Sequence, residues 1–326
     1  MQRLQRPADT LYFGGGTPSV LGGERLSGII AAARPFLTDD AEITVEANPA
    51  DHLYDDFKKL RTAGANRLSI GVQSCIPSEL AAISRRHTPD DAKRTVKDAK
   101  KAGFDNISVD LMLGLPHQTA DTLKSSLEFA VSLDIQHISC YILKLEPKTP
   151  LFEAHLQSPQ SLALPDEDTA ADMYLYMSDY LQKHGFFHYE ISNFAKEGFC
   201  SRHNLKYWND GEYLGLGPAA HSFLNGKRFY FERSTAKYLS SPAVIPDGNG
   251  GDAEEKIMLK LRLAYGIGYG ELEKLIGRDA TDKFKVKAKF FSDAGLAVQT
   301  EDRFALTDKG FLVSNALIGE LICLGE

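Results

Sequence analysis

The chain has 326 residues and a mass of 36.0 kDa, and its 37 Lys and Arg against 44 Asp and Glu give a net charge of −7. This acidic balance disfavours a protein whose affinity comes from neutralising phosphates, so we expect no nucleic-acid partner. No apolar stretch approaches the ~18 residues of a spanning helix, and no signal-type segment opens the chain. We therefore expect a cytoplasmic protein that does not span a membrane.

Short β-type runs alternate with helical patterns from Thr10 to about Ile142, which indicates parallel βαβ units. The expected strands cover residues 10–13, 42–46, 66–71, 106–111 and 137–142, and the helices between them cover 24–33, 55–62, 90–101 and 120–133. Polar groups stand near the carboxyl ends of these strands: Gly14–Thr17, Glu46, Gln73, Asp110 and Tyr141. In a barrel those ends meet at one mouth, so we expect an incomplete (β/α) barrel rather than an open sheet.

The remaining chain predicts a second, smaller domain. A helix over about 166–184 and a Gly- and aromatic-rich stretch over 189–230 extend the barrel domain to residue 240, and residues 241–251 resemble a linker. Residues 252–326 predict three helices, a hairpin and a last helix, as in a winged-helix domain. Because this segment holds 11 Lys and Arg against 13 Asp and Glu, we favour a packing module over a regulatory DNA-binding domain.

The glycine run at residues 14–16 lies directly after the first expected strand. Three residues without Cβ let a ligand approach the backbone N–H and C=O groups, although a tight turn is the alternative. Glu46 would direct a carboxylate over the same mouth, suited to a ribose hydroxyl or an ammonium group, unless it is only a solvated strand end. We therefore interpret the run as a binding loop.

Five motifs in this order resemble the radical S-adenosylmethionine (SAM) proteins of the oxygen-independent coproporphyrinogen III oxidase group. They are Leu11–Pro18, Val45–Pro49, Arg67–Ser74, Arg85–His87 and Ser108–Pro116. The resemblance implies that Gly15, Gly16, Thr17 and Glu46 bind SAM, and that Gln73, Arg85 and Asp110 match positions contacting a second SAM molecule. Arginine can bind a carboxylate through two hydrogen bonds, an aspartate can pair with an ammonium group, and a glutamine supplies a donor and an acceptor.

The resemblance also implies a [4Fe-4S] cluster, which the family binds through a CxxxCxxC loop upstream of the glycine run. No such motif occurs here, and 13 residues precede Gly14. The cysteines, which are Cys75, Cys140, Cys200 and Cys323, are too scattered to replace it. We interpret the chain as a truncated form without the first strand and cluster loop, and we expect no radical chemistry from it as written.

The motif HNxxYW at residues 203–208 resembles the haem-chaperone branch of this group, the HemW proteins. In a helix, His203 and Tyr207 would share one face, and Trp208 would offer a flat apolar surface to a porphyrin. His203 is then the candidate axial ligand of haem iron; the alternative is that it only hydrogen-bonds to a neighbouring loop while Trp208 is core. Cys200 as ligand and His221 as a second haem contact are less favoured, and we expect His221 to be a buried structural histidine.

The resemblance implies a haem chaperone that binds haem and delivers it to haem proteins, including those of the respiratory membrane, from the cytoplasm or the periphery of the inner membrane. SAM and the cluster assist delivery in the full-length family. The alternative function is coproporphyrinogen III dehydrogenase, in which a 5′-deoxyadenosyl radical takes hydrogen from propionate side chains. HNxxYW and the absent cluster motif count against this alternative.

Overall fold

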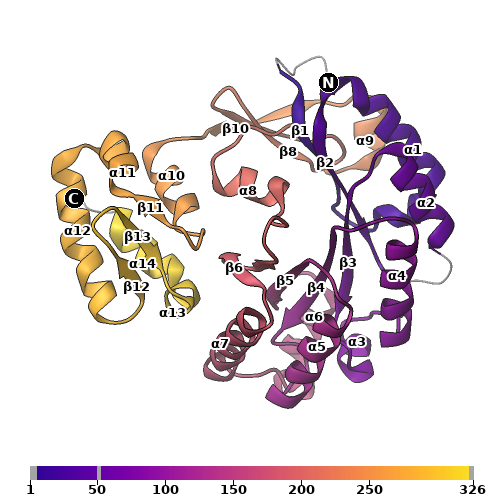
Figure 1. Cartoon of the computed structure of the whole chain (residues 1–326), viewed down its shortest axis with the longest axis horizontal. Coiled ribbons are helices and arrows are strands. Elements are labelled where there is room, and N and C mark those ends of the chain that lie inside the picture. Colours follow the sequence, from indigo (N-terminus) through magenta and orange to yellow (C-terminus); the bar gives the residue numbers. More distant parts are fainter. Residues whose placement is uncertain (1–5, 50–52, 323–326) are drawn as a thin grey trace. The chain divides into compact units, whose positions relative to one another are not determined.

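A computed structural model describes residues 6–49 and 53–322, and the chain divides into two compact units, Met1–Cys200 and Ser201–Glu326. Figure 1 shows the elements of both units, which are described separately below. Among the described residues, no helix is long and apolar enough to cross a membrane.

The first unit is built on a curved sheet of seven strands in the order β1-β2-β3-β4-β5-β7-β6. The first five strands pair in parallel, as expected, and β5 and β7 then pair antiparallel. The strands are β1 (Ala8–Phe13), β2 (Leu37–Ala47), β3 (Arg67–Gln73), β4 (Ile107–Leu113), β5 (His137–Ile142), β6 (Phe187–Glu190) and β7 (Asn193–Ala195). This confirms the expected incomplete α/β barrel, with an antiparallel pair added to it.

Helices connect the strands and cover the outer side of the sheet in Figure 1. They are α1 (Gly22–Ala33), α2 (Tyr54–Ala63), α3 (Pro77–Ala82), α4 (Pro89–Lys101), α5 (Ala120–Ser132), α6 (Pro150–Gln157) and α7 (Glu167–Lys183), with short 3₁₀ turns at η1 (Pro18–Leu21), η2 (Arg34–Phe36) and η3 (Pro159–Leu162). Local signals fix their ends. Thr88 forms a capping box with Asp91 at the start of α4, and Gly64 ends α2 with φ +108°.

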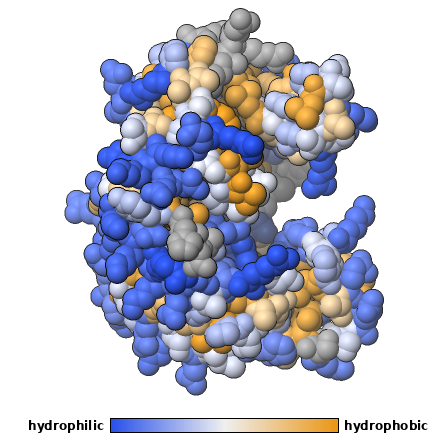
Figure 2. All heavy atoms as spheres, turned by 90° about the vertical axis from the view of Figure 1, so that its right-hand side faces the viewer, coloured by the Kyte–Doolittle hydropathy of each residue, from blue (hydrophilic) through white to orange (hydrophobic). Residues whose placement is uncertain are grey.

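The two faces of the strands differ in polarity. Alternate residues such as Val45, Ile70 and Val109 are fully buried apolar side chains. The intervening positions carry buried polar groups, including Arg67 and His137. The His137 ring lies between the Ser108 hydroxyl at 2.7 Å and the Tyr189 hydroxyl at 2.9 Å. The inner face of the half-barrel is therefore polar, which suits a surface that receives a polar ligand. Figure 2 shows one outer face, where hydrophilic side chains predominate and hydrophobic ones form smaller patches.

The second unit begins with the short helix α8 (Arg202–Trp208), which Ser201 caps by accepting a hydrogen bond from the Asn204 N–H. A three-stranded antiparallel sheet follows in the order β10-β9-β8. Helix α9 lies between β9 and β10 in the chain. These elements are β8 (His221–Leu224), β9 (Lys227–Phe231), α9 (Thr235–Ser240) and β10 (Val244–Asn249). Residues 241–251, which we expected to form a linker, thus contain a strand that pairs with β9.

The rest of this unit contains the expected helices and hairpin. It comprises α10 (Ala253–Lys260), β11 (Ile267–Gly268), α11 (Tyr269–Ile276), α12 (Arg278–Asp293), β12 (Ala297–Gln299), β13 (Arg303–Leu306), α13 (Asp308–Leu312) and α14 (Ser314–Ile322). The two residues of β11 add a third strand to the hairpin. Phe284 and Phe304 meet edge to face in its core, with ring centroids 5.4 Å apart.

Candidate functional sites

The glycine loop follows β1 and meets the end of β2. The Glu46 carboxylate accepts a hydrogen bond from the Tyr12 hydroxyl at 2.8 Å and another from the Gly15 N–H. Burial raises the pKa of Glu46, and these two hydrogen bonds oppose that shift. A Cβ on Gly14 would lie 2.6 Å from the Tyr12 ring, whereas Gly15 and Gly16 face open space. Glycine is thus required at residue 14 by packing, while the next two leave the backbone accessible.

A second group of predicted residues meets through Asn48, just beyond β2. Its amide donates to the Thr17 hydroxyl at 2.8 Å and accepts from Arg85 Nη1 at 2.7 Å. A Cβ on Gly71 would lie 3.0 Å from both Asn48 Oδ1 and Gln73 Nε2. Gln73 itself is buried and has φ +67°, an unusual conformation for a residue with a side chain. Asn48, Gln73 and Arg85 therefore gather around the space that Gly71 leaves, and Thr17 is joined to them through Asn48.

Asp110 lies in the middle of β4 on the polar face. Its carboxylate accepts hydrogen bonds from the hydroxyls of Ser69, at 3.1 Å, and Ser139. Burial raises the pKa of Asp110 to about 6 against these two hydrogen bonds, and the Arg67 charge also opposes the shift. A bound cation would favour its ionised form, so this carboxylate is suited to an ammonium or sulfonium group.

The loop that carries Gln73 rests on a buried carboxylate. Glu79 of α3 is fully buried, and its Oε2 accepts from the Ser74 hydroxyl at 2.6 Å and from Gln118 Nε2 at 3.3 Å. Gln118 in turn accepts from the Gly114 N–H in the loop after β4. One side chain thus joins the loops that follow two neighbouring strands. Glu79 Oε1 has no hydrogen-bond partner in the described part of the chain.

Sequence reasoning missed three residues of this group. Tyr12, Asn48 and Ser69 each hold a predicted residue in place, as described above. Tyr12 lies two residues before Gly14, Ser69 lies two residues before Gly71, and Asn48 lies two residues after Glu46. Strand periodicity would have placed Ser69 on the inner face beside Glu46, its partner in the β2–β3 register.

The described residues do not fit an iron–sulfur cluster. Residues 6–49 and 53–322 contain no group of three His, Cys, Asp or Glu side chains that could hold a metal ion. Cys75, Cys140 and Cys200 are free, and burial raises the pKa of each thiol. Cys323 lies outside the described residues.

The HNxxYW motif forms α8, so His203 and Tyr207 share a face as predicted. His203 Nε2 lies 3.1 Å from the Tyr207 hydroxyl, and the rings meet edge to face with centroids 5.1 Å apart. His203 and Trp208 are partly exposed, and Tyr207 is 39% exposed. Trp208 is therefore not a core residue, and an imidazole, a phenol and an indole lie on one short, accessible helix.

The two alternative haem contacts are His221 and Cys200. His221 is exposed, stacks on Tyr230 with ring centroids 5.0 Å apart and lies 3.7 Å from the Asp247 carboxylate. The prediction of a buried structural histidine is therefore wrong, because β8 directs this side chain to the surface. Burial raises the pKa of Cys200 to about 11, so its thiol is protonated at neutral pH and is a poor iron ligand.

Models of known protein families match both the N-terminal and the C-terminal part of the chain. The Radical SAM superfamily model matches residues 1–130, and the HemN C-terminal domain model matches residues 252–313. A solved structure, coproporphyrinogen III oxidase (HemN) from Escherichia coli, superposes with a TM-score of 0.79 over 97% of this chain and 78% of that one. Its sequence identity is 21%, so this likeness establishes the fold.

Curated relatives specify the family within the superfamily. The heme chaperone HemW of Bacillus subtilis (strain 168) is 36% identical over 331 residues, covering 97% of this chain and 86% of the relative. The heme chaperone HemW of Lactococcus lactis (strain IL1403) is 36% identical over 322 residues, covering 94% and 82%. Identity at this level over nearly the whole chain shows that the protein belongs to the HemW family of radical SAM proteins.

Proposed function

We propose that this chain is a haem chaperone that holds haem through α8 and passes it to haem proteins, including those of the respiratory membrane, from the cytoplasm. The observation that carries the proposal is the pair of His203 and Tyr207 on one partly exposed face of α8, beside Trp208. An imidazole is an ordinary axial ligand of haem iron, and an indole or phenol ring packs well against a porphyrin.

The polar groups of the first unit described above fit SAM, which the superfamily implies together with a cluster. The residues present supply an accessible glycine backbone, two carboxylates and a guanidinium, as described above. Gly15, Gly16, Thr17 and Glu46 would hold the ribose and ammonium groups, and Arg85 would pair with a carboxylate. Gln73 and Asp110 complete the polar wall. SAM supplies a sulfonium group when bound, and these residues would orient it.

The described residues offer no cluster site, so no step of the proposed function passes through a cluster. Haem binding and release need only a ligand for iron and an accessible apolar surface. The proposal therefore separates haem binding, assigned to residues of the second unit, from SAM binding, assigned to residues of the first unit.

An absorbance titration with ferric haem tests the proposal. The purified chain should give a saturable one-to-one change in the Soret band, and His203→Ala should weaken binding substantially. Two matched histidine variants control for adventitious binding. His221→Ala removes an exposed histidine of the same unit, and His184→Ala removes one that stacks on Tyr180 in the first unit.

Both control variants should titrate like the wild type. If His203→Ala also titrates like the wild type, or if no protein saturates, His203 is a structural residue and the proposed ligand is wrong. If only His221→Ala weakens binding, haem binds instead to the sheet that β8 starts. Transfer is then tested by mixing the haem-loaded chain with a haem-free acceptor protein and following the acceptor's own spectrum.

A further inference from the structure

The hydroxyl of Tyr207 is hydrogen-bonded to His203 Nε2, the atom that the proposed function assigns as the ligand of haem iron. His203 Nε2 is the ring nitrogen farthest from the backbone, and it lies 3.1 Å from this hydroxyl. A nitrogen lone pair that accepts a hydrogen bond is not available to a metal. Haem iron and the Tyr207 hydroxyl therefore compete for the same atom.

Tyr207 is held in this position by a second tyrosine. The ring of Tyr213 packs edge to face against it, with centroids 4.7 Å apart. The Tyr213 hydroxyl accepts a hydrogen bond from Arg228 Nη1 at 3.2 Å. The ordinary pKa of a tyrosine is about 10, so the Tyr207 hydroxyl carries its proton at neutral pH. A protonated phenol can donate to Nε2 but is a poor iron ligand itself.

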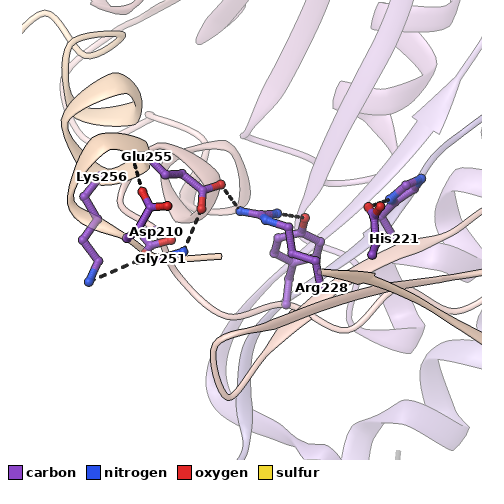
Figure 3. A network of polar contacts seen from close by, with 9 residues as sticks. Asp210, His221, Arg228, Gly251, Glu255 and Lys256 are labelled. Carbon is purple, nitrogen blue, oxygen red and sulfur yellow. Dashed lines mark hydrogen bonds and ion pairs between the residues drawn. The ribbon is translucent and has the colours of Figure 1, made fainter. Parts of the chain in front are cut away.

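Arg228 is fixed in turn by the first helix of the C-terminal domain. In Figure 3 its guanidinium reaches Glu255 on α10, and Glu255 Oε2 also accepts from the Gly251 N–H at 2.7 Å. The segment after α8 is tied to the same helix, because Lys256 Nζ lies 3.8 Å from the Asp210 carboxylate. These contacts all lie within the second unit and extend from the motif histidine to α10.

We infer that Tyr207 is a positioning residue whose hydroxyl takes the place of haem iron on His203 Nε2 until haem binds. A donated hydrogen bond at Nε2 leaves the proton on Nδ1, which is the tautomer that iron binding at Nε2 requires. On loading, the hydrogen bond to Nε2 breaks and the bond from Nε2 to iron forms. The tyrosine keeps its proton and turns to water, and no electron is transferred.

This inference rests on the proposed function, because it assigns to Tyr207 an effect on His203, the proposed ligand of haem iron. It gives the hydroxyl two opposing effects: it orients the imidazole and it weakens haem binding. A chaperone must release its cargo, so a competing internal partner favours release without requiring a second ligand.

The test compares ferric haem titrations of the wild type, Tyr207→Phe and His203→Ala. Tyr207→Phe keeps the ring but removes the competing hydroxyl, so it should bind haem about 2- to 10-fold more tightly, the factor that one net hydrogen bond supplies. Tyr238→Phe is the matched control, since this partly buried tyrosine of the same unit packs on Phe231. It should bind haem like the wild type.

The outcomes separate this inference from the function on which it rests. Weak binding by His203→Ala together with unchanged or weaker binding by Tyr207→Phe overturns the inference alone. Wild-type binding by His203→Ala overturns the ligand and the inference with it. A second measurement needs no variant of Tyr207: ¹⁵N spectra of histidine-labelled, haem-free protein, with the His203 signals assigned by their loss in His203→Ala, should show Nε2 unprotonated. A protonated Nε2 would refute the inference.

Discussion

Replacing Asp110 by asparagine should stabilise the fold while weakening the SAM binding that we propose for the first unit. The folded pKa of about 6 exceeds the ordinary value of 3.8, and at 1.36 kcal/mol per pH unit this difference is worth about 3 kcal/mol at pH 7. The sign follows from protonation: the fold disfavours the ionised form, so stability rises as the pH falls through 6 toward 3.8. Asparagine cannot ionise and can still accept hydrogen bonds from Ser69 and Ser139.

The advantage of Asp110→Asn over the wild type should therefore depend on pH. It should be about 3 kcal/mol at pH 7 and about 1.5 kcal/mol at pH 5, where the wild-type carboxylate is already largely protonated in the folded state but still mostly ionised in the unfolded state. Urea denaturation followed by circular dichroism at the two pH values measures both differences. Calorimetric titration with SAM at pH 7 should show weaker binding to the variant, because the positively charged groups of SAM lose a carboxylate partner.

Asp134→Asn is the matched control in the same unit. Lys100 and Lys196 lower the pKa of Asp134, so this exposed carboxylate favours the ionised form and its replacement should not stabilise the chain. The reasoning about Asp110 is refuted if Asp110→Asn is less stable than the wild type at pH 7, or if its advantage is the same at both pH values.

Three further substitutions, two of them paired with a control variant, test packing and capping by urea or thermal denaturation. Glu79→Ala leaves two buried donors without this acceptor and should cost about 1 to 3 kcal/mol; a loss below about 0.5 kcal/mol would mean that the loops do not depend on it. Gly266→Ala should cost at least about 3 kcal/mol, because its Cβ would lie 2.0 Å from the Phe304 carbonyl oxygen, whereas Gly295→Ala, also at positive φ but facing open space, should cost about 1 kcal/mol. Equal losses would contradict the clash. Thr88→Ala removes the N-cap of α4 and should cost about 1 kcal/mol, and Thr88→Ser, which keeps the hydroxyl, should retain most of it.

The sequence was most informative where local pattern and tertiary structure agree. The first five strands and the helices between them follow from alternating runs with clear caps, and the structure moves their ends by only a few residues, except at β2, which begins five residues before the expected start. The family motifs also placed Glu46 and Gln73 near the carboxyl ends of neighbouring strands, whereas Asp110 lies in the middle of β4. Parallel strands bring their carboxyl ends together, so a one-dimensional order was enough to predict their proximity.

Local pattern failed where pairing depends on distant partners. Strands β6 and β7 have four and three residues, too short for a recognisable period, and they form because β5 offers an edge to pair with. The role of Asn48 depends on two side chains from other loops, which no spacing rule encodes. The exposure of His221 follows from which face of β8 turns outward, and its sequence context did not show that face.

The change from parallel to antiparallel pairing at β5 bears on how the first unit folds. Each of the first four strands pairs with the next strand along the chain after a helical connection, which contains two α-helices only between β3 and β4, so these contacts close shorter loops. β5 and β7, by contrast, are separated by residues 143–192, and their pairing closes a long loop at a larger entropic cost. The same loop closure brings the Cys140 N–H to 2.7 Å from the Ser192 carbonyl oxygen, to which it donates a hydrogen bond. During synthesis, β5 would expose an unpaired edge until α7 and β7 have left the ribosome, and such an edge is open to mispairing.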